Sequence, residues 1–316
     1  MPSTAPLSLR SIRSFYVGGS PHQIRNTPIE TRHVVPDAEP RAIDMNGSYT
    51  VGQIYVQEYR LANPRHPYPV LLWHGGGMCG SQWEATPDQQ DGWLWLLLQS
   101  GFDVMIADGP ERGRSSWLLA SQDDLPVYRS KEEAWSLFRI GPAGGYAAEP
   151  AQRNAFAGQQ FPCDAFDDFS KQFVPRWTDH MALEQQAYEA LVSRIGPCIL
   201  IGHSQGGGYA LRVAQRLPSH VKAVVALEPT GMPDTSHCSQ APHLAIWGDH
   251  IEHSPLWQSY RKTADAFWQR LGQTTHTALI DLPRQEIHGN SHFLMLDRNT
   301  RQIAGLMCQW LHAQLA

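Results

Sequence analysis

The sequence is poor in cysteine, and the cysteines it has are far apart. Its 316 residues include 5 cysteines, at positions 79, 163, 198, 238 and 308, and no two of them form a Cys-x-x-Cys pair. Zinc ribbons and disulfide-dense scaffolds both need closely and regularly spaced cysteines. The spacing therefore speaks against both classes, and no metal site is expected.

An excess of basic residues and a long apolar run are also missing. The net charge is −5 without a basic cluster, which argues against binding to nucleic acid or to an anionic membrane. No stretch approaches the roughly 20 apolar residues that a membrane-spanning helix needs. The first 20 residues lack the apolar core of a signal peptide, so the sequence as written predicts a cytoplasmic protein. A periplasmic location stays open, because a cleaved signal peptide would leave the same sequence.

Short apolar runs alternate with helix-compatible stretches along most of the chain. The runs are residues 70–73, 104–107, 198–201, 223–227, 243–247 and 277–280, and the helical stretches are 93–99, 181–195, 209–217, 257–271 and 302–315. Such runs are typical of strands that are buried on both faces of a parallel sheet. Residues 14–17 and 49–56 predict an antiparallel hairpin before them. The pattern predicts an α/β fold with a mostly parallel, doubly wound sheet and a site at the C-terminal ends of its strands.

Residues 118–179 interrupt this alternation. They are rich in aromatic residues, glycine and proline and contain no convincing buried strand. A connection of that length is improbable as a mere loop. We interpret it as a helical cap, inserted between the fourth and fifth strands of a core made of residues 1–117 and 180–316. The alternative is a surface excursion unrelated to substrate, but the aromatic residues need burial, which favours a cap that supplies apolar substrate contacts.

Residues 202–206 read Gly-His-Ser-Gln-Gly between an apolar run and a helix-compatible stretch. In a Gly-x-Ser-x-Gly motif the serine occupies a strained turn between strand and helix, and the flanking glycines let the two elements pass each other. Ser204 is therefore the predicted nucleophile. A phosphate-binding glycine turn is the alternative, but the chain lacks both the dinucleotide fingerprint spacing and a Walker lysine.

A serine hydroxyl needs a histidine base, and this base needs a carboxylate to orient it. In hydrolases built on this kind of sheet the nucleophile, acid and histidine follow in that order along the chain. His288 and His292 both lie after the last predicted strand. We favour His292, because a glycine and two short polar residues precede it and the apolar residues 293–295 can anchor its loop. His288 remains the alternative.

The acid is not at its usual place, three residues after the glycine that follows the penultimate strand. That position is Ile251, which cannot orient an imidazole. Glu228 directly follows the preceding strand, and burial beside a histidine that becomes cationic would keep it ionised. Glu228 is thus the predicted acid, with Asp249 and Glu252 as alternatives.

A glycine-rich loop, residues 73–77, ends the first buried strand. Backbone N–H groups of such a loop, together with that of the residue after the nucleophile, bind the negative charge that develops on the substrate. Gly76, together with Gly77, and Gln205 are the predicted donors of this oxyanion hole. A flexible turn is the alternative reading of three glycines.

With these motifs the chain resembles the α/β-hydrolases and, more narrowly, a small family of bacterial esterases with a Ser-His-Glu triad. The similarity runs from residue 14 almost to the end and includes residues 83–88, 112–115, 202–205, 225–229, 248–252 and 288–292. It implies Ser204, Glu228 and His292 as the triad. The oxyanion loop and residues 144–160 depart from the family pattern, so the mechanism carries over better than the substrate. Such esterases often form dimers, and a homodimer is accordingly an implied partner state.

The expected function is that of a serine carboxylester hydrolase that forms an acyl-enzyme and requires no cofactor or metal. Its expected partner is a small neutral ester, apolar or aromatic in character, as the 11 tryptophans suggest. The same triad also serves for lactones, thioesters, amides, carbon–carbon bonds and acyl transfer. A catalytically silent binding protein on the same fold is a further alternative, although every triad position is filled.

Overall fold

The computed structural model describes residues 6–118, 125–234 and 239–315 of the chain. The central sheet has eight strands, in the order β1 (Leu9–Ile24), β4 (Gly47–Leu61), β6 (Val104–Asp108), β5 (Val70–Trp73), β7 (Cys198–His203), β8 (Val221–Leu227), β9 (His243–Trp247) and β10 (Thr277–Asp281). From β6 to β10 neighbouring strands are parallel, whereas β4 pairs antiparallel with β6 and with β1. The predicted α/β fold, with its mostly parallel sheet and antiparallel hairpin, is confirmed.

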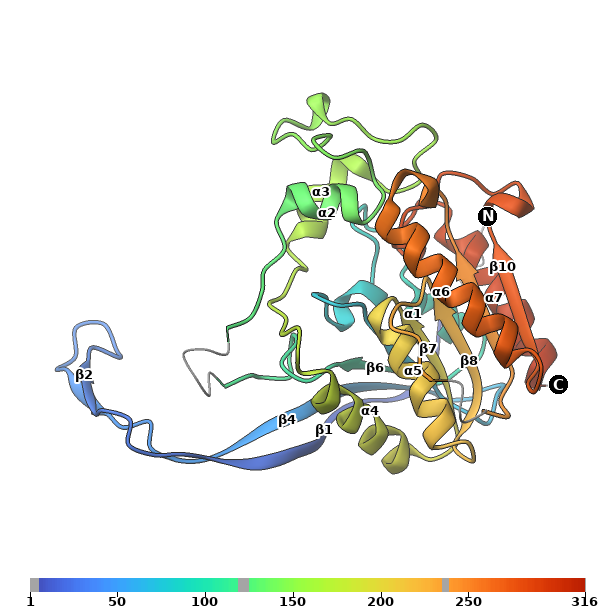
Figure 1. Cartoon of the computed structure of the whole chain (residues 1–316). Coiled ribbons are helices and arrows are strands. Elements are labelled where there is room, and N and C mark those ends of the chain that lie inside the picture. Colours follow the sequence, from blue (N-terminus) through green and yellow to red (C-terminus); the bar gives the residue numbers. More distant parts are fainter. Residues whose placement is uncertain (1–5, 119–124, 235–238, 316) are drawn as a thin grey trace.

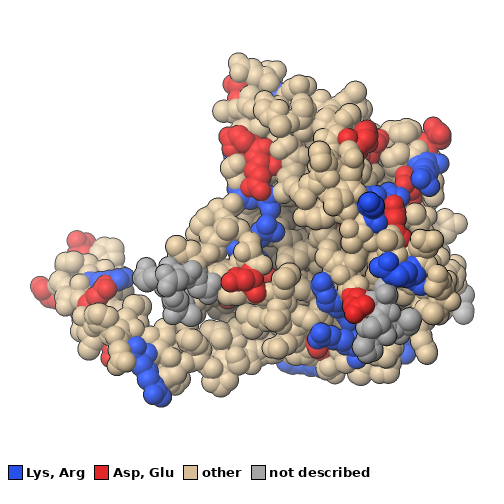
Figure 2. All heavy atoms as spheres, in the orientation of Figure 1, with Lys and Arg blue, Asp and Glu red and all other residues tan. Residues whose placement is uncertain are grey.

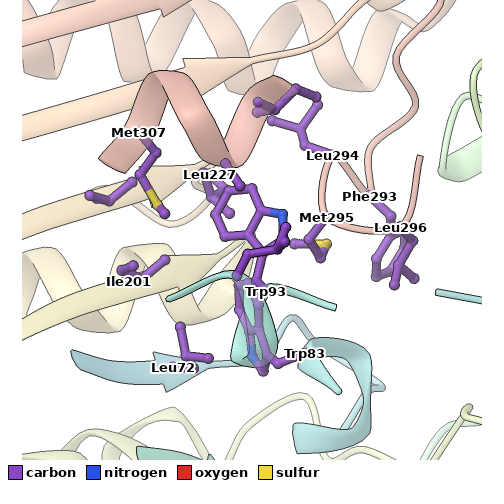
Figure 3. Packing of buried hydrophobic residues seen from close by; sticks show 14 of the residues in the cluster. Leu72, Trp83, Trp93, Ile201, Leu227, Phe293, Leu294, Met295, Leu296 and Met307 are labelled. Carbon is purple, nitrogen blue, oxygen red and sulfur yellow. The ribbon is translucent and has the colours of Figure 1, made fainter. Parts of the chain in front are cut away.

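Helices cover both faces of the sheet (Figure 1). These are α1 (Trp93–Gln99), α4 (Met181–Ile195), α5 (Gln205–Arg216), α6 (Pro255–Leu271) and α7 (Thr300–Leu315), whereas α2 (Lys131–Leu137) and α3 (Phe166–Ser170) lie apart from the sheet. Successive side chains of a strand point to opposite faces, so Leu72 and Ile201 pack with α1 and α7, while Leu71 and Leu200 pack with α4, α5 and α6. Figure 3 shows the first of these clusters, with Trp83 and Trp93 between the sheet and the segment from Phe293 to Leu296.

The N-terminal hairpin is longer than predicted. β1 and β4 pair from Leu9 with Leu61 to Ile24 with Gly47, and Figure 1 shows their outer part standing away from the body as an arm. At its tip lie β2 (Glu30–Arg32) and β3 (Arg41–Ile43). The sequence analysis predicted only part of the length of this hairpin. The side chains of β1 are exposed or half-buried, so an apolar pattern marks only some of its residues.

The segment 118–179 lies between β6 and α4, and its described part contains α2 and α3. Five of its aromatic side chains are buried in one cluster with Phe293, namely Trp135, Phe138, Phe161, Phe166 and Phe169. The segment therefore packs against the loop that carries His292. Its role as a cap stays a prediction, and residues 119–124 of it lie outside the described residues.

Two expectations about the whole chain can be compared with the described residues. Among their helices, none combines the length and apolar character that crossing a membrane requires. Cys79, Cys163, Cys198 and Cys308 are free thiols, and Cys238 lies outside the described residues. The described cysteines thus contribute no cross-links to the fold.

Candidate active site

Ser204 occupies the sharp turn between β7 and α5. Its backbone is left-handed, with φ 54° and ψ −117°, a conformation that costs energy for a residue other than glycine and that often occurs at functional sites. A Cβ on Gly202 would lie 2.4 Å from the carbonyl oxygen of Gly206, and a Cβ on Gly206 would lie 2.5 Å from that of His74. Glycine is therefore required at both positions. Ser204 lines a cavity of about 460 Å³.

The close approach of Gly206 to the backbone of His74 leads to a testable prediction. Gly206→Ala forces its new methyl group into the backbone that follows β5, and overpacking of this kind typically costs about 1–3 kcal/mol. We expect a lower free energy of unfolding, measured by urea denaturation. Gly305→Ala is the matched control, because a Cβ there meets nothing within 4 Å on helix α7, and it should stabilise the protein by up to about 1 kcal/mol. Equal stability of the two variants would contradict the close approach.

His292 lies on the loop before α7 and lines the same cavity as Ser204. Its Nδ1 is 2.8 Å from Oε2 of Glu228, and both side chains are buried. An ionised carboxylate only accepts hydrogen bonds, so Nδ1 carries the proton and Nε2 is left as the proton acceptor. The structure thus joins the predicted base to the predicted acid, across 64 residues of sequence.

Glu228 directly follows β8 and has a left-handed backbone, with φ 47°. Its Oε1 accepts hydrogen bonds from Nη2 of Arg139, at 2.5 Å, and from the backbone N–H of Gly248, at 2.6 Å. Together with His292 these groups give the buried carboxylate three donors. A buried charge is tolerated only with such partners, so the site is built to hold an ionised Glu228.

The buried imidazoles are neutral at rest. Burial, followed by the positive charges of Arg139 and Arg129, lowers the pKa of His292 well below its usual value. Burial and the neighbouring His292 likewise lower the pKa of His203 well below its usual value. A neutral His292 is the form that can accept a proton from a serine.

His203 links the base to the glycine-rich loop. Its Nε2 donates to the carbonyl oxygen of His292, at 2.9 Å, which leaves Nδ1 to accept from Nε2 of Gln82, at 3.4 Å. The side-chain oxygen of Gln82 accepts from the N–H of Gly75, at 3.3 Å. One chain of hydrogen bonds therefore fixes the positions of the base loop and the oxyanion loop relative to each other.

The predicted oxyanion donors lie beside Ser204. Gly76 and Gln205 line the cavity, and neither backbone N–H has an acceptor within the described ranges of the chain. Gln205 is also the first residue of α5, where the helix dipole favours negative charge. Gly77 borders a smaller neighbouring cavity of about 220 Å³ instead, and its carbonyl oxygen accepts from the N–H of Val174.

The alternative base and acids lie away from this cavity. His288 is 57% exposed and faces Asp249, with 3.4 Å between Nδ1 and Oδ2. Glu252 is 65% exposed and faces His253. The structure brings neither His288 nor either of the two acids to Ser204.

The same outer loop contains a set of side chains with metal-binding groups. His250, Glu252 and His253 place ligand atoms within 4.8 Å of one another. Glu252 and His253 are both more than half exposed, and none of the three lines the cavity of Ser204. Exposed groups of this kind are common without a metal, so we assign no metal role here.

Arg139, His203 and Asp297 were missed by the sequence analysis. Asp297 is buried and accepts hydrogen bonds from Asn290 and from the backbone and side chain of Ser291, which holds the loop before His292. Burial raises the pKa of Asp297 to about 7. His203 belongs to the serine motif and was a detectable candidate, whereas no sequence pattern connects Arg139 or Asp297 to a triad.

Arg139 comes from the segment 118–179 and acts as a positioning residue for Glu228. Besides its ion pair, its Nε donates to the carbonyl oxygen of Asp249. We expect Arg139→Met to lower kcat/KM roughly 10- to 100-fold, the usual effect of a lost hydrogen bond to a charged group. Because Arg139 lowers the pKa of His292, its removal should also move the acidic limb of the pH profile, expected below pH 6.5, to higher pH.

Arg153→Met is the matched control for Arg139→Met. Arg153 is a buried arginine of the same segment and pairs with Asp167. Its replacement should leave the position of the acidic limb unchanged. An acidic limb at the same pH in Arg139→Met and in the parent protein would contradict the positioning role. Arg139→Lys should restore part of the activity.

The chain is similar to known proteins in sequence and in fold. A family model described as the alpha/beta hydrolase fold matches residues 68–286. The solved structure of a bacterial esterase is 31% identical, covers 99% of this chain and 98% of its own, and superposes with a TM-score of 0.84. A probable secreted lipase from a fungus (Fungal sp.) is 26% identical to this chain, in an alignment that covers 85% of this chain and 88% of the lipase.

Proposed function

The chain belongs to the α/β-hydrolase fold family and is a hydrolytic enzyme, and we propose that it is a serine carboxylester hydrolase that forms an acyl-enzyme on Ser204. One observation carries the proposal most strongly. His292, which is paired with the buried Glu228, lines the same cavity as Ser204, and Ser204 occupies a strained turn. A neutral imidazole, oriented by a carboxylate and next to a serine, is the arrangement that activates a hydroxyl for acyl transfer.

The proposed reaction has two halves. Nε2 of His292 takes the proton of Ser204 as the serine oxygen attacks the ester carbonyl, and Glu228 stabilises the imidazolium that forms. The N–H groups of Gly76 and Gln205 bind the oxyanion. The imidazolium then gives its proton to the leaving alcohol, and a water molecule activated by His292 releases the acid from Ser204. No step uses a cofactor or a metal.

The cavity supports an ester with an apolar portion. Apolar and aromatic side chains form much of its wall, namely Leu137, Phe138, Trp177, Met181, Leu256, Trp257 and Tyr260. A volume of about 460 Å³ lies in the usual range for small-molecule sites. These walls favour the predicted apolar or aromatic substrate, while the basic residues beside them raise a separate question.

A comparison of bond types tests the proposed reaction against its alternatives. We expect a simple ester such as p-nitrophenyl butyrate to be hydrolysed faster than a thioester, a lactone or an anilide of the same acyl length. Added ethanol should change the products little, because water is the proposed acceptor. Faster turnover of another bond type, or ester formation as the main outcome, would replace the carboxylesterase assignment, and no turnover of any substrate would favour a silent binding protein.

Location and oligomeric state remain predictions. The fungal relative is described as secreted, whereas the location predicted for this chain is cytoplasmic. For the homodimer, the N-terminal hairpin and its tip offer exposed apolar side chains, namely Ile12, Tyr16, Ile29, Val34 and Val35. Apolar surface of this kind is typical of protein interfaces. We therefore expect a mass measurement in solution to give the mass of two copies of the full chain.

A further inference from the structure

The cavity of Ser204 has a basic side that a neutral ester does not explain. Three arginines line it, Arg129, Arg176 and Arg212, against a single acid, Glu133. Figure 2 shows basic side chains (blue) beside the hollow at the centre of the molecule, next to acidic ones (red). The net charge of the chain does not indicate this basic side, because the chain as a whole is acidic.

These arginines differ in what they bind. Nη2 of Arg212 donates to the carbonyl oxygen of Gly231, at 2.8 Å. Nη1 of Arg129 donates to Glu133, at 2.6 Å, but its buried Nε has no partner. The guanidinium of Arg176 has no acceptor among the described residues. Arg176 therefore keeps donors that a ligand can use, and Arg129, whose unpaired Nε is itself buried, lines the cavity beside it.

Both of these guanidinium groups stand over the proposed oxyanion loop. A Cβ on Gly76 would lie 2.9 Å from Nη1 of Arg176, and a Cβ on Gly77 would lie 3.9 Å from Nε of Arg129. A Cβ on the adjacent Gly75 would lie 3.3 Å from Cβ of Ser204. An anion bound by these arginines would therefore lie at the oxyanion loop, close to Ser204.

The backbone holds this pair of arginines in place. Val127 and Arg176 form an antiparallel bridge with two hydrogen bonds, of 2.8 and 3.1 Å, and Arg129 is two residues further along the chain. The side chain of Arg129 is only 7% exposed and packs over the ring of Phe138. The arginines are therefore part of the cavity wall rather than freely moving surface side chains.

This arrangement has an electrostatic cost in the absence of a ligand. Burial and the nearby Arg176 lower the pKa of Arg129, opposed by Glu133. Beside the oxyanion loop, the positive charges of Arg129 and Arg176 face a single carboxylate, that of Glu133, which is half-exposed. One monoanion would balance the excess charge, and the planar fork of an arginine matches a carboxylate well.

We propose that the substrate of this site is an ester that also carries a carboxylate, a hemiester of a dicarboxylic acid, with Arg176 and Arg129 binding the free carboxylate. This inference rests on the proposed esterase function and refines its substrate class. The apolar walls contact the methylene chain, while the arginines fix the charged end. The enzyme therefore selects an acyl group with a negative end over an uncharged one of equal length.

The test compares ethyl hydrogen adipate with ethyl hexanoate, which has a methyl group in place of the carboxylic acid. Hydrolysis is followed by pH-stat titration. We expect the parent enzyme to prefer the hemiester, and Arg176→Gln to reduce the ratio of the two kcat/KM values by about tenfold or more, mainly through KM of the hemiester. Arg216→Gln is the control, since this arginine pairs with Glu189 outside the cavity, and it should keep the parent ratio.

Two results would overturn the inference and leave the esterase function intact. One is a parent enzyme that prefers ethyl hexanoate. The other is an equal loss on both esters in Arg176→Gln, which would assign Arg176 to the oxyanion instead. A calorimetric titration gives a readout without turnover: Ser204→Ala should bind ethyl hydrogen adipate, and Ser204→Ala with Arg176→Gln should bind it at least about tenfold more weakly. Hydrolysis by Ser204→Ala would instead contradict the proposed function itself.

Discussion

Ser204→Ala is expected to lower kcat for p-nitrophenyl butyrate by roughly 10⁴- to 10⁶-fold, because the attacking oxygen is lost while the oxyanion donors remain. The change removes one oxygen at the turn between β7 and α5 and leaves the left-handed backbone of the turn in place. The variant should therefore unfold at the same urea concentration as the parent. Steady-state kinetics with the purified variant measure the effect.

Ser219→Ala is the control for this loss of activity. Ser219 lies on the exposed connection before β8 and contacts His220, away from the residues that line the cavity. Its replacement should change kcat less than twofold, since surface substitutions are close to neutral, within about 0.5 kcal/mol. Parent-like turnover by a folded Ser204→Ala would contradict the assignment of the nucleophile.

Glu228→Gln is expected to lower kcat by about 10⁴-fold, as the equivalent change does in other triads. The carboxylate accepts from His292, Arg139 and Gly248, whereas an amide has one accepting atom and one donating atom. An amide donor facing Nδ1 would leave the proton on Nε2, where the ring can no longer take the proton of Ser204. Stopped-flow measurement of the first turnover would show the loss in the acylation step.

The control for Glu228→Gln is the alternative acid of the sequence analysis. Glu252 is 65% exposed and lies outside the cavity, so Glu252→Gln should keep parent-like kcat. Both results are needed, because the sequence alone left the two glutamates open. A large loss in Glu252→Gln together with near-normal Glu228→Gln would transfer the role of the acid to the outer loop.

The parts of the fold predicted well from sequence are those with a continuous apolar pattern. The helices predicted at 93–99 and 181–195 have the same bounds as α1 and α4. The buried residues of α1 are all apolar, as its pattern predicts, whereas α4 also buries Glu184 and Gln185. Helix α5 begins at Gln205 rather than at 209. Its first turn contains three glycines, which disfavour a helix intrinsically, and close packing against β5 and β7 overrides that preference.

The residues of the candidate site also differ in whether the sequence could predict them. Ser204, Glu228 and His292 could be selected because chain order and strand ends constrain a triad. Arg139 and Arg176 could not, because an arginine in an irregular segment gives no periodic or spacing signal. Their positions depend on how the segment 118–179 packs against the loop that carries His292, and contacts between residues distant in the sequence determine this packing. The basic wall of the cavity was missed for the same reason.

The central claim is that Ser204 becomes acylated through His292, and a trapped adduct tests it most directly. The full chain is treated with a fluorophosphonate, and the modified residue is located by mass spectrometry of its peptides. The account predicts one adduct, on Ser204, that is absent in Ser204→Ala and formed far more slowly in His292→Ala. An adduct on another residue, or turnover of esters by a protein whose Ser204 remains unmodified, would contradict it.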